Sequence, residues 1–199
     1  MFAFDFAWDI QHLLNQFWEQ IQFLLLIIAL ALAYISYKNP AYGTGLVIIL
    51  LPTYLFRSQI YFLPFTFLEI CIWILFFGWI LNLLKQDNFS ARTRIPYQPQ
   101  IFLIIIASIV SLFIAPNISA AAGLWKAYII EPILFFTILY NVYQNIENKK
   151  IILWSLGIST LSIALLAIYQ KFTGFGIFEP SWAAPEHRRV TSFFSSPNA

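Results

Sequence analysis

Residues 101–115 read IFLIIIASIVSLFIA, and this stretch decides the fold class. Its apolar side chains do not alternate with polar ones, as they do in a barrel strand that has one face in lipid and the other in water. Backbone polar groups in hydrocarbon must be satisfied within a helix or within a closed barrel. The stretch therefore predicts a transmembrane α-helix, and similar apolar runs recur along the chain.

The overall composition is that of a membrane protein. Of the 199 residues, 60% are hydrophobic and 10% are charged, and the mean hydropathy is +0.75. A soluble domain has roughly a quarter charged residues, because its surface faces water. The formal net charge of +2 comes from scattered basic residues, so no nucleic acid partner is expected. Cys71 is the only cysteine, which excludes an internal disulfide and a cysteine-based metal cluster.

Polar residues divide the chain into apolar runs that approach or exceed the roughly 17–20 residues needed to cross a bilayer as a helix. We expect an all-α, polytopic transmembrane helix bundle whose spans lie at 20–37, 41–56, 64–84, 100–115, 124–143 and 151–170. Residues 1–19 mix Phe and Trp with Asp, Gln and His, which predicts an interfacial helix or a tilted partial span. Residues 171–199 follow the last span as a loop.

Basic residues indicate the orientation of these spans. Short cytoplasmic loops are enriched in Lys and Arg. The pairs Arg92/Arg94 and Lys149/Lys150 lie in tight loops next to spans, on the same side of the predicted bundle. We therefore expect the amino terminus and residues 171–199 on the extracytoplasmic side.

Ionisable residues inside spans are costly, and by default they indicate function. Glu69 and Glu131 lie in the third and fifth predicted spans, within two turns of the extracytoplasmic surface, and Arg57 and Lys126 lie at span ends on that side. Lys126 and Glu131 are five residues apart and do not share a face of an α-helix, so each is expected to bond to another helix. Two structural interpretations stay open: the cations snorkel to the interface, or they pair with the acids and fix the helix register.

Small residues in the second predicted span have a simpler interpretation. Gly43, Thr44 and Gly45 do not follow a strand, so they do not form a phosphate-binding loop. Small residues in membrane helices allow the backbones to approach closely. We expect this segment to pack tightly against neighbouring helices.

Residues 189–198 read RVTSFFSSPN, an R-x-x-S-x-F-x-x-P-N string. It resembles the motif that precedes a mid-protein span in the O-antigen ligase and O-antigen polymerase family. Two weaker likenesses come earlier in the chain. They are Leu51-Pro52 through Arg57 with Pro64 to Glu69, and Leu124 to Tyr128 through Glu131-Pro132.

This resemblance implies a polytopic glycosyltransferase of the bacterial inner membrane. Such enzymes transfer or polymerise glycan from an undecaprenyl-pyrophosphate carrier, onto lipid A core or another glycan or lipid acceptor, on the extracytoplasmic face. They need no nucleotide sugar and no metal, so no cofactor is expected. The family has about twice as many spans and a later catalytic histidine. The resemblance therefore implies an amino-terminal part of such a protein, which is inactive alone and holds no catalytic residue of its own.

The resemblance also assigns roles to residues. Arg189 takes the place of the motif arginine, which implies binding of the pyrophosphate, and Arg188 is a weaker candidate one position away. The resemblance implies that Arg57 and Lys126 are further cationic ligands of the pyrophosphate. The residues that it implies as supporting groups of the site are Glu69, Glu131, Ser192, Pro197 and Asn198.

Two other classes of function stay open. A transporter or channel-like protein would use Glu69 and Glu131 as a proton or ion relay. Such proteins often contain internal repeats and broken helices near the midplane, and no convincing repeat is visible. The third possibility is a non-catalytic membrane subunit or assembly factor.

Overall fold

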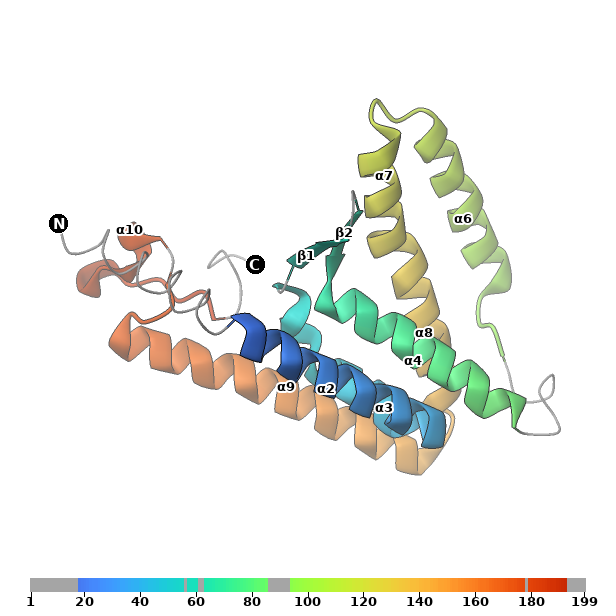
Figure 1. Cartoon of the computed structure of the whole chain (residues 1–199), viewed down its shortest axis with the longest axis horizontal. Coiled ribbons are helices and arrows are strands. Elements are labelled where there is room, and N and C mark those ends of the chain that lie inside the picture. Colours follow the sequence, from blue (N-terminus) through green and yellow to red (C-terminus); the bar gives the residue numbers. More distant parts are fainter. Residues whose placement is uncertain (1–17, 56, 61–62, 86–93, 178, 193–199) are drawn as a thin grey trace. The chain divides into compact units, whose positions relative to one another are not determined.

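The computed structural model describes residues 18–55, 57–60, 63–85, 94–177 and 179–192 (Figure 1). The main helices are α2 (Trp18–Lys38), α3 (Pro40–Ile49), α4 (Phe67–Leu84), α6 (Gln98–Phe113), α7 (Ile118–Trp125), α8 (Glu131–Val142) and α9 (Ile146–Thr173). The shorter elements are η1 (Leu51–Leu55), β1 (Arg57–Ile60), β2 (Leu63–Thr66), η2 (Lys126–Ile130), α10 (Pro180–Ala183) and η3 (Pro185–His187). The chain forms two compact units: unit 1 contains Met1–Ile28 and Gly157–Ala199, and unit 2 contains Ala29–Leu156.

The prediction of a helical membrane protein is confirmed, whereas six spans are not. Within the described ranges, three helices are long and apolar enough to cross a bilayer: Phe67–Leu84, the continuous helix Ile118–Val142, and Ile146–Thr173. The shorter apolar helices are Gln22–Lys38, Pro40–Ile49 and Gln98–Phe113. The predicted interfacial segment 1–19 lies almost entirely outside the described residues.

The second predicted span differs most from the structure. Only Pro40–Ile49 of that region is α-helical, and ten residues rise about 15 Å, half of the roughly 30 Å of bilayer hydrocarbon. Pro52 lies in the 3-10 turn that follows, where its missing N–H cannot continue the α-helical bonding. The chain then forms the antiparallel β1–β2 hairpin, with Arg57 opposite Thr66, which the all-α prediction did not include.

Small residues let helices of unit 2 pack closely, as expected for the glycine segment. Gly43 and Gly78 both lie against Ser36 of α2, and a methyl group on Gly78 would stand 2.6 Å from Ser36 Cβ. Gly45 lies against Ser155, where a methyl group would stand 2.6 Å from the hydroxyl oxygen. Three helix contacts of unit 2 therefore leave no room for a side chain.

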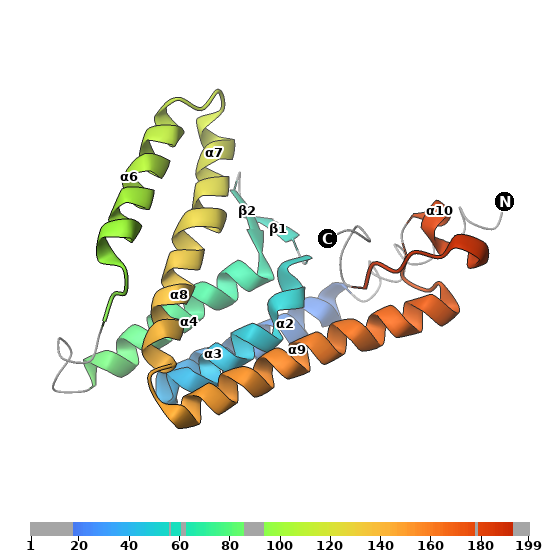
Figure 2. The same cartoon turned by 180° about the vertical axis from the view of Figure 1, so that it is seen from behind.

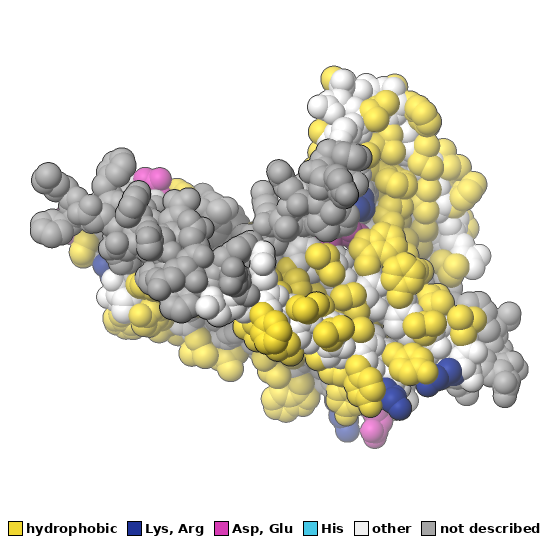
Figure 3. Space-filling model, in the orientation of Figure 1, with side chains coloured by type: hydrophobic (Ala, Val, Ile, Leu, Met, Phe, Trp, Pro, Cys, Tyr) yellow, Lys and Arg dark blue, Asp and Glu magenta, His cyan; other side chains and the backbone are white. Residues whose placement is uncertain are grey.

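Much of the surface of unit 2 is suited to lipid rather than to water. Helices α6 and α7 meet at the loop that joins them and diverge from it (Figures 1 and 2), and α6 has no buried residue, although eleven of its sixteen residues are hydrophobic. Phe113 at its end is 79% exposed. The space-filling view shows hydrophobic side chains over much of the described surface on the face that it draws (Figure 3). Exposed apolar surface of this extent indicates that the protein lies in a lipid bilayer.

Candidate functional site

The first cluster of polar side chains begins where the hairpin leads into α4. Strand β2 ends at Thr66, whose hydroxyl accepts a hydrogen bond from the backbone N–H of Glu69 at 3.2 Å. The same hydroxyl donates to Oε1 of Glu69, also at 3.2 Å. This N-terminal cap satisfies a helix N–H, and the positive end of the helix dipole stabilises the carboxylate. Glu69 is thereby held in one orientation in the first turn of α4.

Lys126 forms an ion pair with this carboxylate. Its Nζ lies 2.6 Å from Oε2 of Glu69, and the two side chains are only 18% and 13% exposed. The structural interpretation in which cation and acid pair between helices therefore holds for this pair. The two residues are 57 positions apart in the sequence, and their ion pair joins α4 to the helix that begins at Ile118.

Glu131 is the most deeply buried charged side chain among the described residues, at 2% exposure. One of its carboxylate oxygens accepts a 3.1 Å hydrogen bond from the indole N–H of Trp73 on α4. As expected, Lys126 and Glu131 each bond to another helix. Both bonds go to the same helix, α4, which the α-helical spacing did not predict.

A π-helical turn brings these two side chains to one side. Residues 126–130 form η2, in which the N–H of Glu131 donates to the carbonyl of Lys126, five residues back. An α-helix would place residues five apart roughly 140° from each other, whereas the wider turn brings them nearer to one face. Pro132 explains the turn, because proline has no N–H to donate and its ring clashes with the carbonyl four residues back.

The helix that carries Glu131 starts earlier than predicted. The predicted span began at residue 124, but the helix begins at Ile118, capped by the Asn117 side chain, which accepts from the N–H of Ala120. Glu131 therefore follows the first helical residue by 13 positions, roughly 20 Å along the axis. It lies near the middle of its helix, whereas Glu69 lies in the first turn of α4.

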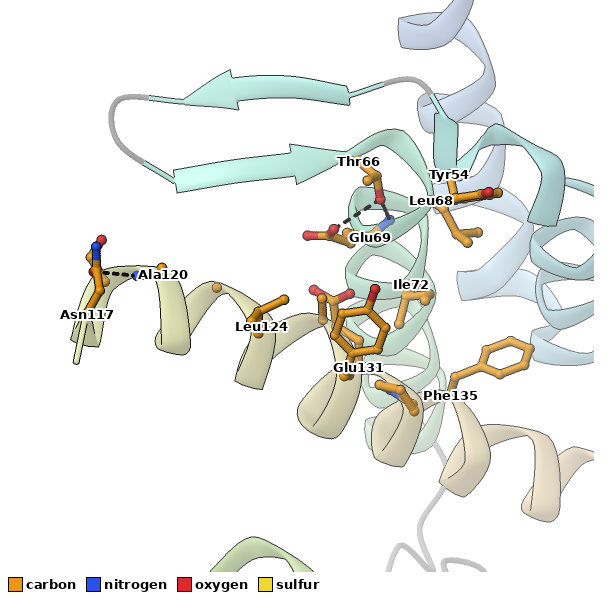
Figure 4. Close-up of a pocket in the computed structure, with 15 residues that line it drawn as sticks. Tyr54, Thr66, Leu68, Glu69, Ile72, Asn117, Ala120, Leu124, Glu131 and Phe135 are labelled. Carbon is orange, nitrogen blue, oxygen red and sulfur yellow. Dashed lines mark hydrogen bonds between the residues drawn. The ribbon is translucent and has the colours of Figure 1, made fainter. Parts of the chain in front are cut away.

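The two carboxylates line a cavity of about 950 Å³ within unit 2. Figure 4 shows Glu69 and Glu131 in the space between α4 and the helix that carries η2. The lining residues are Tyr54, Thr66, Leu68, Glu69, Ile72, Asn117, Ser119, Ala120, Gly123, Leu124, Ala127, Tyr128, Glu131, Pro132 and Phe135. Carboxylate and hydroxyl groups on apolar walls can accept hydrogen bonds from hydroxyl or amine groups. Because Lys126 is already paired with Glu69, the cavity is poorly matched to pyrophosphate.

The second cluster, in unit 1, holds the tail at the end of α9. The Arg188 guanidinium donates through Nη1 to the carbonyls of Lys171 and Phe172, both at 2.9 Å, and through Nε to the carbonyl of Ala183 at 3.0 Å. It thereby satisfies two carbonyls in the last turn of the helix. Gly174 makes room for it: its φ is +75°, and a methyl group there would lie 2.9 Å from the guanidinium. Arg188 is therefore a structural residue of this turn.

Arg189 has a different environment from its neighbour. Its backbone N–H donates to the carbonyl of Trp182 at 2.9 Å, and the residue is exposed. Ser192 is fixed against α9, because its hydroxyl donates to the carbonyl of Ile163 at 2.8 Å. Residues 189–192, the first four of the string, thus lie along the carboxyl-terminal part of α9, which is long enough to cross a membrane.

The predicted site residues are only partly brought together. Glu69, Lys126 and Glu131 meet in unit 2, whereas Arg188, Arg189 and Ser192 belong to unit 1 and form a cluster of their own. Arg57 lies in β1, and the structure describes its backbone only. Pro197 and Asn198 lie outside the described residues.

Sequence reasoning missed three polar side chains that hold these clusters. Thr66 has a visible signal, since Thr66-x-x-Glu69 is a capping-box pattern before an apolar run. Gln170 is a polar residue in an apolar helix, which is a weaker signal. Trp73 has none, because most tryptophans of this apolar sequence look like interface anchors.

Neither a search for metal-binding groups nor comparison with known proteins assigns a function to these clusters. Within the described ranges, no group of three or more His, Cys, Asp or Glu side chains is placed to hold a metal ion. Comparison with models of protein families, with curated proteins and with solved structures finds no match to this chain.

Proposed function

We propose that this chain is part of a membrane glycosyltransferase that transfers or polymerises glycan from an undecaprenyl-pyrophosphate carrier. In this proposal it lies in the bacterial inner membrane with residues 171–199 on the extracytoplasmic face, and Arg189 binds the pyrophosphate. The resemblance of residues 189–198 to the O-antigen ligase and polymerase motif supports it.

The observation that carries the proposal is the attachment of the arginine string to the end of α9. Lys150 and Thr173 lie 23 residues apart on this helix, about 35 Å, which exceeds the roughly 30 Å of hydrocarbon in a bilayer. A helix that crosses the bilayer therefore places its last turn at the level of the lipid headgroups. Arg188 fastens the start of the string to that turn, and Arg189 beside it is exposed. Ser192 bonds farther back along α9, to the carbonyl of Ile163.

An arginine at this level suits a lipid pyrophosphate. Its planar guanidinium donates two parallel hydrogen bonds to phosphate oxygens. During transfer, the bond between the anomeric carbon of the sugar and a pyrophosphate oxygen breaks, and the electron pair stays on that oxygen. An acceptor hydroxyl forms the new bond to the anomeric carbon, and its proton passes to water or to the departing pyrophosphate. Arg189 stabilises the negative charge as it develops on the leaving group.

Binding to a defined lipid tests this role. The chain is reconstituted in lipid nanodiscs, and its affinity for undecaprenyl pyrophosphate is measured for wild type, Arg189→Ala and Arg189→Lys. Loss of a charged hydrogen-bonding partner predicts a decrease of about 10- to 100-fold for Arg189→Ala and a smaller decrease for Arg189→Lys, which keeps the charge but loses the fork.

The matched control is Lys150→Ala, which removes an exposed cation near the opposite end of α9 and is expected to leave affinity unchanged. Unchanged affinity in Arg189→Ala, in a protein that inserts normally, would contradict the proposed role. The same variant in the full-length protein is expected to abolish glycan transfer.

One observation favours a second function, ion or proton translocation. Glu131 lies near the middle of its helix, and it shares a cavity with Glu69. Carboxylates at such depth are typical of proton relays. Proteoliposomes with an imposed pH gradient separate the two functions, because a relay requires proton flux that Glu131→Gln abolishes. The glycosyltransferase proposal predicts no such flux.

A further inference from the structure

Gln170 is a buried polar residue near the end of α9. Its side chain is only 1% exposed, although it lies within three residues of the carboxyl end of the helix. Polar side chains near span ends usually reach toward water. The burial of Gln170 therefore needs a specific partner.

That partner is the backbone of the arginine string. Oε1 of Gln170 accepts from the N–H of Thr191 at 3.0 Å and from the N–H of Ser192 at 2.6 Å. Its Nε2 donates to the carbonyl of Ser192 at 3.0 Å and to the carbonyl of Gly176 at 3.4 Å. A single amide thus bonds two segments of the tail to the helix.

We infer that Gln170 is a positioning residue, which fixes the backbone beside Arg189 so that the guanidinium is presented in one place at the membrane surface. This inference rests on the proposed function, because it assigns Gln170 a part in pyrophosphate binding. Two hydrogen bonds hold the backbone at and after Arg189. The N–H of Arg189 donates to the carbonyl of Trp182, and the N–H of Thr191 donates to Oε1 of Gln170.

The chemistry of the site favours glutamine over similar side chains. Glutamate keeps the acceptor for Thr191 and Ser192 but places a second oxygen against the carbonyls of Ser192 and Gly176. Leucine keeps the volume and leaves two N–H groups and two carbonyls without this partner. Only a side chain with donor and acceptor at one end satisfies both sets of bonds.

If the string is already ordered before the ligand binds, the conformational entropy cost of binding is smaller. Ordering the backbone of one residue corresponds to a change of about 5- to 30-fold in an equilibrium constant. We expect Gln170→Leu to weaken undecaprenyl pyrophosphate binding by this factor when Arg189 is present. In an Arg189→Ala background the same substitution should have no further effect, because the guanidinium to be positioned is gone.

Two measurements on the chain in nanodiscs test the inference. Hydrogen–deuterium exchange of the peptide that contains Thr191 and Ser192 reports the anchor itself, and it should accelerate in Gln170→Leu. Affinity for undecaprenyl pyrophosphate in the four combinations of Gln170→Leu and Arg189→Ala reports positioning. Gln144→Leu, which replaces an exposed glutamine of unit 2, is the matched control.

The outcomes distinguish this inference from the function on which it rests. If wild type binds the lipid and Gln170→Leu weakens binding only when Arg189 is present, the inference is supported. Three results would overturn positioning and leave the proposed function standing. Hydrogen exchange could stay unchanged in Gln170→Leu, or exchange could accelerate while affinity stays the same. Gln170→Leu could also weaken lipid binding equally with and without Arg189. If wild type does not bind, the proposed function fails first. Gln170→Glu provides a second variant, with an intermediate effect expected, should Gln170→Leu not fold.

Discussion

Replacing Lys126 with methionine removes the ammonium that lies 2.6 Å from Glu69. The side chains are 18% and 13% exposed, so the remaining carboxylate stays largely shielded from water. Removing one partner of a buried ion pair typically costs about 3–5 kcal/mol, because a buried charge is left uncompensated. The effect should be at the lower end here, since Thr66 and the first turn of α4 still stabilise the Glu69 carboxylate.

The partner substitution should cost less. In Glu69→Gln the ammonium of Lys126 loses its ion pair, but the amide oxygen that replaces the carboxylate can still accept its hydrogen bond. We expect a loss of about 1–2 kcal/mol for this variant, and the double variant Glu69→Gln/Lys126→Met should lie within about 1 kcal/mol of wild type, because neutral replacement of a whole buried pair is often tolerated. The double variant should therefore be more stable than Lys126→Met alone.

The free energy of unfolding in detergent micelles, followed by tryptophan fluorescence, measures these effects. Lys150→Met, which replaces an exposed lysine near the start of α9, is the control for loss of a surface cation. The reasoning is refuted if Lys126→Met costs no more than Lys150→Met, or if the double variant loses the sum of the two single losses.

Further variants address the turn after α9 and the buried acid. Gly174→Ala puts a side chain at a φ of +75° and against Arg188, so the unfolding free energy should fall by at least about 1–2 kcal/mol, whereas Gly157→Ala, with open space around it, should be neutral or stabilising. Equal melting temperatures for the two alanine variants would contradict this. Trp73→Phe removes the donor to Glu131 and should lower the unfolding free energy by about 1–3 kcal/mol. A change below about 0.3 kcal/mol in chemical unfolding would show that this bond adds nothing.

Helices could be predicted from apolar length where no proline or cap intervened. The predicted run 64–84 corresponds to Phe67–Leu84, and the run 100–115 corresponds to Gln98–Phe113. The run 41–56 is also apolar, but Pro52 and the hairpin that follows end the helix at Ile49. Hydropathy does not register such local backbone chemistry.

The start of the helix at Ile118 was missed for a related reason. Residues 118–123 read ISAAAG, and most of their side chains are small. Their modest hydropathy after Asn117 is also typical of a loop. Alanine nevertheless favours helix, and the asparagine is a good N-cap. Recognising that cap would have placed Glu131 near the middle of its helix.

The site could be predicted as a set of charged residues but not as a set of contacts. Charges inside apolar runs identified Glu69, Lys126 and Glu131, and their pairing depends on helix packing and on the π-turn before Pro132. Arg188 and Arg189 are chemically identical in the sequence. In the structure, the turn at Gly174 makes room for Arg188 to bond to helix carbonyls, whereas Arg189 is exposed.

Cysteine accessibility at the two ends of α9 tests the central claim, that the arginine string lies at the extracytoplasmic end of a spanning helix. Single cysteines are introduced as Arg189→Cys and Lys150→Cys in a Cys71→Ser background, and intact cells are treated with a membrane-impermeant maleimide. The account predicts labelling at position 189 in intact cells, and at position 150 only after permeabilisation. Labelling at 150 but not at 189 would place the string in the cytoplasm, where it cannot act on an extracytoplasmic lipid-linked glycan.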